Sequence, residues 1–182
     1  MSPMPLTLAR IESALDGKEF QELESRDGIV TIRVSMANAL QTLRILRDAA
    51  GFEVSTFVTA VDHADAGNPA DGRFDLIWQF QSIQHKDRIR VHAWVAGEEV
   101  EEATFSAPSI TGLWPGAAYS ERECFDMFGI QFEGHANLRR ILMPDAYEHH
   151  PLRKEFPHGG IEPDKLYKAW DKKRREPAGE RS

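Results

Sequence analysis

Residues 74–95 of the 182-residue chain read FDLIWQFQSIQHKDRIRVHAWV and carry its clearest alternation of apolar and polar side chains. The apolar positions are Phe74, Leu76, Trp78 and Phe80 in the first half and Ile89, Val91, Ala93 and Val95 in the second. Successive side chains of a strand point to opposite faces, so this period of two predicts two neighbouring strands that share one apolar face. The polar stretch around His85 and Asp87 predicts the loop between them.

The sequence before this pair predicts further strands and two helices. Residues 29–34 and 53–62 are rich in β-branched side chains and predict strands. Apolar residues at intervals of three and four predict a first helix from Leu6 to Leu15 and a second from Ser35 to Gly51. The order helix, strand, helix, strand, strand, strand predicts an α+β fold with a mixed sheet of about four to five strands. We expect the helices to pack on one face of that sheet.

Helical signals return after Pro108. Ser109 can begin a short helix that reaches Leu113, and a longer helix is predicted from about Ala117 to Phe128, ending at Gly129. In this helix we expect three aromatic side chains to pack and four residues to form a charged face. The aromatic residues are Tyr119, Phe125 and Phe128, and the charged residues are Glu121, Arg122, Glu123 and Asp126. Arg122 and Asp126 are one turn apart, so an ion pair between them is expected. The acidic run at 98–102 is interpreted as a solvated connection.

Residues 144–182 differ in composition from the body of the chain. They contain 5 of the 10 prolines, 10 apolar residues in 39, and nearly balanced charges, 9 basic and 8 acidic. Such a segment can neither build a core nor continue a helix through its prolines. We therefore expect residues 1–143 to form the α+β domain, and residues 144–182 to form an extended, Pro-rich tail that lies on partner subunits.

Composition also excludes several classes of protein and site. The net charge of −7 argues against nucleic acid as a partner. A lone cysteine, Cys124, excludes an internal disulfide framework and a four-thiolate cluster supplied by this chain. Glycine-rich nucleotide motifs and HExxH are absent. With no apolar stretch of membrane-spanning length and no signal sequence, we expect a protein that is cytoplasmic or peripheral to something larger.

Two catalytic interpretations remain open from the residues alone. Four histidines, His135, His149, His150 and His158, could bind zinc or iron together with Asp126 or Asp145. Adjacent histidines on an extended chain point to opposite faces, which disfavours this metal site. Cys124 could act as a nucleophile, but the neighbouring carboxylates would raise the pKa of its thiol.

The run from 121 to 142, ERECFDMFGIQFEGHANLRRIL, resembles the signature of a known family, the C-type (thirty-kilodalton) subunit of NADH-quinone oxidoreductase, respiratory complex I. Three other stretches are similar to that family: HPLRKEFP at 150–157, SITGLWPGAAY at 109–119 and TAVD at 59–62. Ala136, Tyr147 and His149 depart from its usual pattern. The residues that we assign to the family signature and its interfaces are Glu121, Arg122, Glu123, Asp126, Gly129, His135, Arg139, Arg140, His150, Pro151, Leu152, Arg153 and Lys154.

The resemblance implies a subunit of the peripheral arm without a cofactor, a metal or catalytic residues of its own. The FMN and iron–sulfur clusters that carry electrons from NADH to quinone would belong to partner subunits. It implies the D-type subunit and the adjoining region of the B-type subunit as partners, and a position on the cytoplasmic face of the cell membrane. The charged signature residues would then form ion pairs, either between subunits or internally between helix and tail. The alternatives are the equivalent subunit of a related membrane-bound hydrogenase or other quinone-module dehydrogenase, and a free-standing His/Asp metalloenzyme.

Overall fold

A computed structural model of the chain describes residues 4–64, 72–97 and 105–161. Five strands form the main sheet: β1 (Gln21–Leu23), β2 (Val30–Arg33), β3 (Val54–Asp62), β4 (Phe74–Ser82) and β5 (Asp87–Val95). Their order across the sheet is β1-β2-β5-β4-β3. Only the β2–β5 pair of this sheet is parallel. The α+β fold with a mixed sheet, which the order of the elements predicted, is therefore confirmed.

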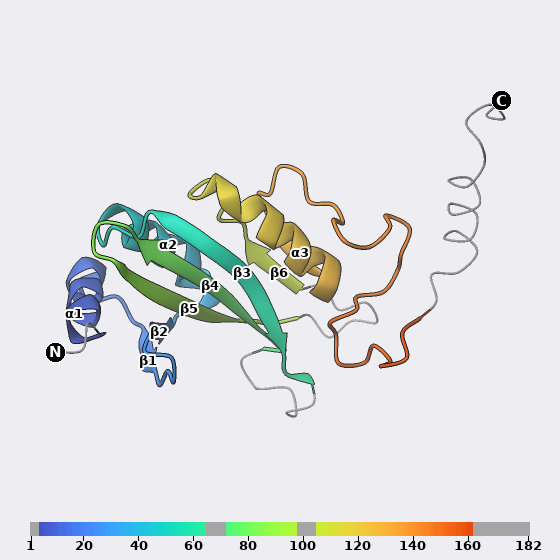
Figure 1. The fold of residues 1–182 in the computed structure, drawn as a ribbon, viewed down its shortest axis with the longest axis horizontal. Helices are drawn as coiled ribbons and strands as arrows, with labels where there is room; N and C mark the ends of the chain where they lie inside the picture. Colours follow the sequence, from blue (N-terminus) through green and yellow to red (C-terminus); the bar gives the residue numbers. More distant parts are fainter. Residues whose placement is uncertain (1–3, 65–71, 98–104, 162–182) are drawn as a thin grey trace.

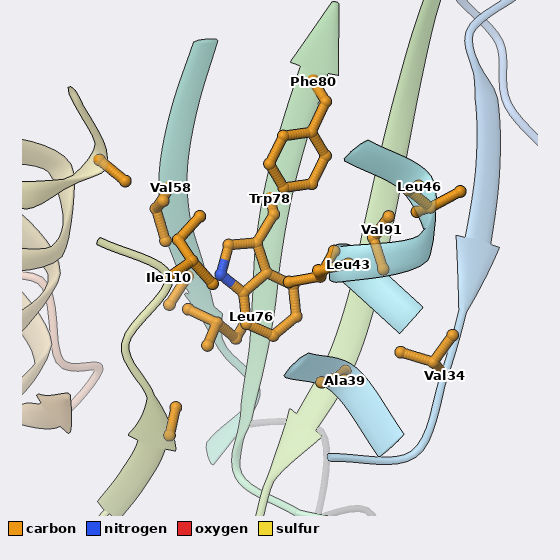
Figure 2. Close-up of a cluster of buried hydrophobic side chains, with 14 of the residues drawn as sticks. Val34, Ala39, Leu43, Leu46, Val58, Leu76, Trp78, Phe80, Val91 and Ile110 are labelled. Atoms are coloured by element: carbon orange, nitrogen blue, oxygen red, sulfur yellow. The ribbon is translucent and has the colours of Figure 1, made fainter. Parts of the chain in front are cut away.

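Two helices cover the apolar face of the sheet (Figure 1). They are α1 (Met4–Leu15) and α2 (Met36–Asp48). Trp78 of β4 lies at the centre of the interface, close to Ala39 and Leu43 of α2 (Figure 2). The side chains of Trp78 and Leu43 are fully buried. Each such apolar side chain contributes about 1.5–3 kcal/mol relative to an exposed position, so this interface is a main source of stability.

A second structural unit lies beside β3, at the end of the sheet away from α1 (Figure 1). It contains β6 (Phe105–Pro108), the 3-10 turn η2 (Pro115–Ala117), α3 (Ala118–Phe128) and β7 (Ile130–Glu133). β6 and β7 form a parallel two-stranded sheet. The thiol of Cys124 in α3 lies 3.4 Å from the carbonyl oxygen of Val58, so α3 packs closely on the edge strand β3.

Several expectations from the sequence are wrong in detail. Residues 111–113 form a hydrogen-bonded turn and not a helix. Tyr119 is 67 % exposed and does not pack in the core. The strands β1, β6 and β7 were not predicted, because each has only three or four residues and none has the run of β-branched residues that marks β2. The acidic run at 98–102 lies outside the described residues, as does the end of the tail from 162 to 182.

No helix in the described part of the chain is both long and apolar enough to cross a bilayer.

Candidate functional site

Two carboxylates of α3 are fully buried, although the sequence predicted an exposed charged face. Glu121 and Asp126 have no solvent-exposed surface, whereas Glu123 between them is exposed. A buried carboxylate is costly unless hydrogen bonds and charges compensate it. The partners of these two groups therefore define the site.

Asp126 holds the loop 138–143 against α3. One carboxylate oxygen, Oδ2, accepts hydrogen bonds from the backbone N–H groups of residues 141, 142 and 143, at 2.9, 2.7 and 2.9 Å. The other oxygen, Oδ1, accepts one from Arg140 Nη1 at 2.6 Å. The ion-pair partner of Asp126 is thus Arg140 and not Arg122, so the expected pair within the helix is wrong. Arg140 lies in a loop beyond the end of α3 at Phe128, so helical spacing cannot identify this pair.

Arg122 binds two carbonyl groups of the same loop. Its Nε donates to the carbonyl oxygen of Arg139 at 3.0 Å, and its Nη2 donates to that of Arg140 at 2.9 Å. The fork of the guanidinium group thus spans two consecutive peptide groups. Both ends of the loop backbone are fixed, the carbonyl groups by Arg122 and the amide groups by Asp126.

Burial alone would raise the pKa of the Asp126 carboxyl. The backbone hydrogen bonds from residues 141–143 and the side chain of Arg140 outweigh that effect, so its pKa lies below the ordinary value. Asp126 is therefore charged at neutral pH, with each oxygen satisfied. The contrast with Glu121 is direct, because burial raises the pKa of the Glu121 carboxyl despite hydrogen bonds from Ile110 and Ser109.

Glu121 joins α3 to the segment that enters it. Its carboxylate accepts the backbone N–H of Ile110 and the hydroxyl of Ser109, both at 2.7 Å. His135 binds the start of the helix, with Nε2 3.1 Å from the carbonyl oxygen of Ala118. Its Nδ1 accepts the backbone N–H of Asn137, so the proton lies on Nε2.

The last carbonyl groups of α3 are satisfied by residues 150–155, which we call the strap. A helix leaves its last four carbonyl groups without partners inside the helix. Here His150 Nδ1 lies 3.0 Å from the carbonyl oxygen of Asp126. The N–H of Leu152 donates to Met127 O at 3.1 Å, and Arg153 Nε donates to Phe128 O at 2.7 Å. The positive charge of Arg153 also opposes the negative end of the helix dipole. The strap thus binds the C-terminal end of α3, so two stretches that resemble the family contact each other within this chain.

Gly129 is the residue that lets the strap approach. It ends α3 with φ +77°, in the left-handed region that favours glycine. A Cβ atom at this position would lie 2.6 Å from His150 Nε2 and would also collide with the guanidinium group of Arg153. The signature glycine therefore has two separate physical reasons, backbone conformation and close packing.

A third buried carboxylate fastens the strap to the sheet. Asp62, at the end of β3, accepts the backbone N–H of Lys154 at 2.9 Å. It also forms a bidentate ion pair with Arg73, at 2.9 and 2.7 Å, and Arg73 pairs in addition with Glu155 of the strap. Burial would raise the pKa of Asp62, but these donors outweigh it and the pKa is lowered. The stretch TAVD at 59–62 stood out in the sequence, but no role was predicted for Asp62 or Arg73.

The remaining candidate residues make no shared centre. Cys124 is buried, and burial together with Glu123 and Glu121 raises the pKa of its thiol, which disfavours the nucleophilic thiolate. Among the described residues, no three His, Cys, Asp or Glu side chains could together hold a metal ion. His149 and His158 are exposed, Pro151 is half-buried, and Arg139 points to solvent.

Comparison with known proteins gives the family of this chain. The family model described as "Respiratory-chain NADH dehydrogenase, 30 Kd subunit" matches residues 32–162. The C-type subunit of NADH-quinone oxidoreductase from Citrifermentans bemidjiense is 45 % identical over 133 residues, 73 % of this chain and 77 % of that protein. A fused C/D protein of the same enzyme from Sulfurihydrogenibium is 34 % identical over 149 residues, which is 81 % of this chain but 24 % of the longer protein.

Two solved structures share the fold. A trypsin-resistant fragment of Nqo5 superposes with a TM-score of 0.62 at 25 % identity, covering 72 % of this chain and 99 % of the fragment. A chain of an archaeal membrane-bound sulfane sulfur reductase superposes with a TM-score of 0.66, over 98 % of this chain and 94 % of that one. Its identity of 21 % makes it a likeness of fold alone. From the family match and the relatives together, the chain belongs to the thirty-kilodalton subunit family of respiratory-chain NADH dehydrogenases.

Proposed function

We propose that this chain is the C-type subunit of an NADH-quinone oxidoreductase and acts in its peripheral arm, on the cytoplasmic face of the membrane. The observation that carries the proposal is the 45 % identity to a C-type subunit over most of both chains. In this proposal the FMN and iron–sulfur clusters lie in partner subunits, which pass electrons from NADH to quinone. This chain contributes shape and assembly and no catalytic residue.

The contacts of the signature support a scaffold role. The polar groups of Asp126, Arg140 and Arg153 bind backbone and side chains of the same chain. Groups satisfied in this way fix a conformation, and they are not free to bind or activate a substrate. The function that fits them is to hold a rigid surface and to direct the part of the tail that follows the strap toward a partner.

The fused relative supports the D-type subunit as that partner. In the Sulfurihydrogenibium protein, the part that matches this chain is 24 % of a C/D polypeptide. Two proteins that one chain can join are able to lie side by side. We propose in addition that the adjoining region of the B-type subunit contacts this chain. The relatives' names favour the NADH-dependent enzyme over a hydrogenase, and genes for NADH- and flavin-binding subunits beside this one would separate the two.

Two truncations test the scaffold role of the tail. The first ends the chain after Ile161 and keeps the strap, and the second ends it after Met143 and removes the strap. Each truncated gene replaces the native one, and the complex is purified through a tag on another subunit. We expect neither truncated chain to support full assembly and quinone reduction. Only the second should lose thermal stability as a purified protein, because it exposes the carbonyl groups at the end of α3.

The result that would overturn the role of the tail is full quinone reduction by a complex that contains the shorter chains. Analysis of the purified chain tests the absence of cofactors separately. Stoichiometric flavin, iron or zinc in the isolated protein would contradict the proposal and favour the metalloenzyme alternative.

A further inference from the structure

The loop 138–143 exposes large apolar side chains on a backbone that is firmly held. Leu142 is 62 % exposed and Ile141 is 36 % exposed. Single exposed apolar residues are common and need no explanation. These two are adjacent, however, and all three N–H groups of residues 141–143 are bound by the buried carboxylate of Asp126.

Arg139 adds a free positive charge to the same loop. Its carbonyl group is held by Arg122, but within residues 4–64, 72–97 and 105–161 its exposed guanidinium group has no partner. Arg140, the next residue, points inward to Asp126. Of the two neighbouring arginines, Arg140 thus binds inside the chain and Arg139 is exposed. An exposed arginine beside apolar residues is typical of the centre of a protein interface.

The rigidity of the loop makes it suited to binding. Ordering a flexible loop on association costs free energy, and a loop that is already fixed avoids that cost. The buried ion pair and the three amide contacts fix the backbone before any partner arrives. A partner that offers an apolar depression and a carboxylate would match these side chains.

Two observations favour the D-type subunit as this partner, namely the position of Ile161 and the fused relative. The described chain ends at Ile161, whose carbonyl oxygen lies 3.4 Å from the hydroxyl of Tyr147. The ring of Tyr147 in turn lies under the guanidinium group of Arg140, 5.9 Å from Cζ to the ring centre. Ile161 is therefore linked through Tyr147 to Arg140 of loop 138–143, and this part of the chain lies at the α3 end of the molecule (Figure 1). In the fused relative, the D part shares one polypeptide with the part that matches this chain.

We propose that Arg139, Ile141 and Leu142 dock on the D-type subunit, through an apolar depression flanked by a carboxylate. This inference rests on the proposed function, and it adds the surface that makes the contact. The docking side chains belong to loop 138–143, whose backbone is fixed by Asp126 and Arg122, and not to the Pro-rich tail.

Binding of the full-length chain to the D-type subunit of the same complex tests the proposal. We expect Leu142→Ser together with Ile141→Ser to weaken binding by about tenfold or more, since two apolar side chains lose their burial. Arg139→Glu should weaken binding by a similar factor, and this effect should shrink at high salt. The matched controls are Ile83→Ser, which is 65 % exposed at the other end of the sheet, and Arg26→Glu on an exposed turn. Both controls should bind as the wild type does.

The outcomes separate this inference from the proposed function. Wild-type protein that fails to bind the D-type subunit would contradict the proposed function itself. Wild-type binding that the loop variants leave unchanged would overturn the docking surface alone. Loss of self-association in the loop variants, with unchanged binding to the D-type subunit, would also overturn it and would assign the patch to a second copy of this chain. Equal melting temperatures of all variants exclude misfolding as the cause.

Discussion

The helices α2 and α3 pack on the same sheet, but only α3 buries charged side chains in doing so. α2 buries Leu43 and Leu46 against the apolar face of the sheet, and its charged residues Arg44 and Asp48 are exposed. α3 also buries apolar residues, Met127 and Phe128 among them, but it buries Glu121 and Asp126 as well, whose partners lie in the segments that precede and follow the helix. Apolar packing has no required partner atom, whereas each buried carboxylate needs particular donors. α2 is therefore defined by its own sequence, whereas α3 depends also on its partners.

The largest effect is expected for Asp126→Ala. This change leaves the guanidinium group of Arg140 and three N–H groups without their acceptor, which should lower the free energy of unfolding by about 3–5 kcal/mol. Urea unfolding at neutral pH measures the loss. Asp48→Ala in α2 is the control, because its pair with Arg47 is exposed and its removal should have no measurable effect. A loss for Asp126→Ala as small as that of the control would contradict the proposed role of the carboxylate.

The pH dependence of this contribution follows from the direction of the shift. The folded-state pKa of Asp126 lies below its ordinary value of 3.8. Its stabilisation is therefore full above that ordinary value and is lost as the pH falls through the lower, folded-state pKa. The difference between wild type and Asp126→Ala should be constant from about pH 5 to 8 and should shrink in acid.

Leu43→Ala tests the apolar packing of α2 on the sheet. The substitution leaves a cavity against the sheet and should lower the free energy of unfolding by about 3 kcal/mol. Because no charge is involved, the loss should be the same in neutral and acidic solution. The exposed Gln41→Ala in the same helix serves as the control. If the effect of Leu43→Ala disappeared in acid as that of Asp126→Ala does, the distinction between the two helices would be wrong.

Gly129→Ala should have a smaller effect, of about 2 kcal/mol, from a strained backbone and from displacement of the strap. Gly28→Ala separates the two causes, because Gly28 has φ +72° but no atom within 4 Å of an added Cβ. We expect about 1 kcal/mol for that control. Urea unfolding gives both values, and cleavage of the strap by a protease should be faster only in Gly129→Ala. Equal losses in the two variants would show that strap packing at Gly129 is unimportant.

The smallest effect is expected for Glu121→Gln, which should leave stability at neutral pH unchanged or raise it by up to about 1 kcal/mol. Burial raises the folded-state pKa of Glu121 above 4.5. Its stabilisation is therefore full below 4.5 and is lost as the pH rises through the folded-state pKa. Glutamine keeps an acceptor for Ile110 without the charge, so this slope should vanish in the variant. Unfolding is measured from acid to neutral pH. A loss of stability of more than about 1 kcal/mol at neutral pH in Glu121→Gln would contradict the raised pKa of Glu121.

The sheet was predictable because its information is local. The alternation in residues 74–95 defines β4 and β5, and the intervals of three and four among Ala39, Leu43 and Leu46 define α2. Each pattern lies within one element and reflects a single period. β1, β6 and β7 escaped prediction because they are short and lack the β-branched residues by which the equally short β2 was predicted.

The site was only partly predictable. Its members were identified through the resemblance to a family, since the signature residues share no period and no spacing rule. Their partners were not identified. The distribution of charges in α3 suggested an exposed face, but Asp126 is buried and pairs with Arg140 in a loop. Asp62 and Arg73, which hold the strap, had no motif except TAVD.

From the residues alone came the α+β class, the covered face of the sheet, the tail with its unusual composition, and the family. Those properties depend on composition, on periodicity and on a run of residues that matches the family signature. All three can be read along the sequence without knowledge of the fold. Folding in three dimensions decided which carboxylates are buried, which arginine joins each of them, and which neighbour faces solvent. A buried charge is stable only beside donors that converge from distant parts of the chain, such as residues 62, 73 and 154. These contacts between distant residues cannot be read from a linear pattern. Only the packed structure shows that most signature residues bind other parts of the same chain, and that Arg139, Ile141 and Leu142 stay exposed for a partner.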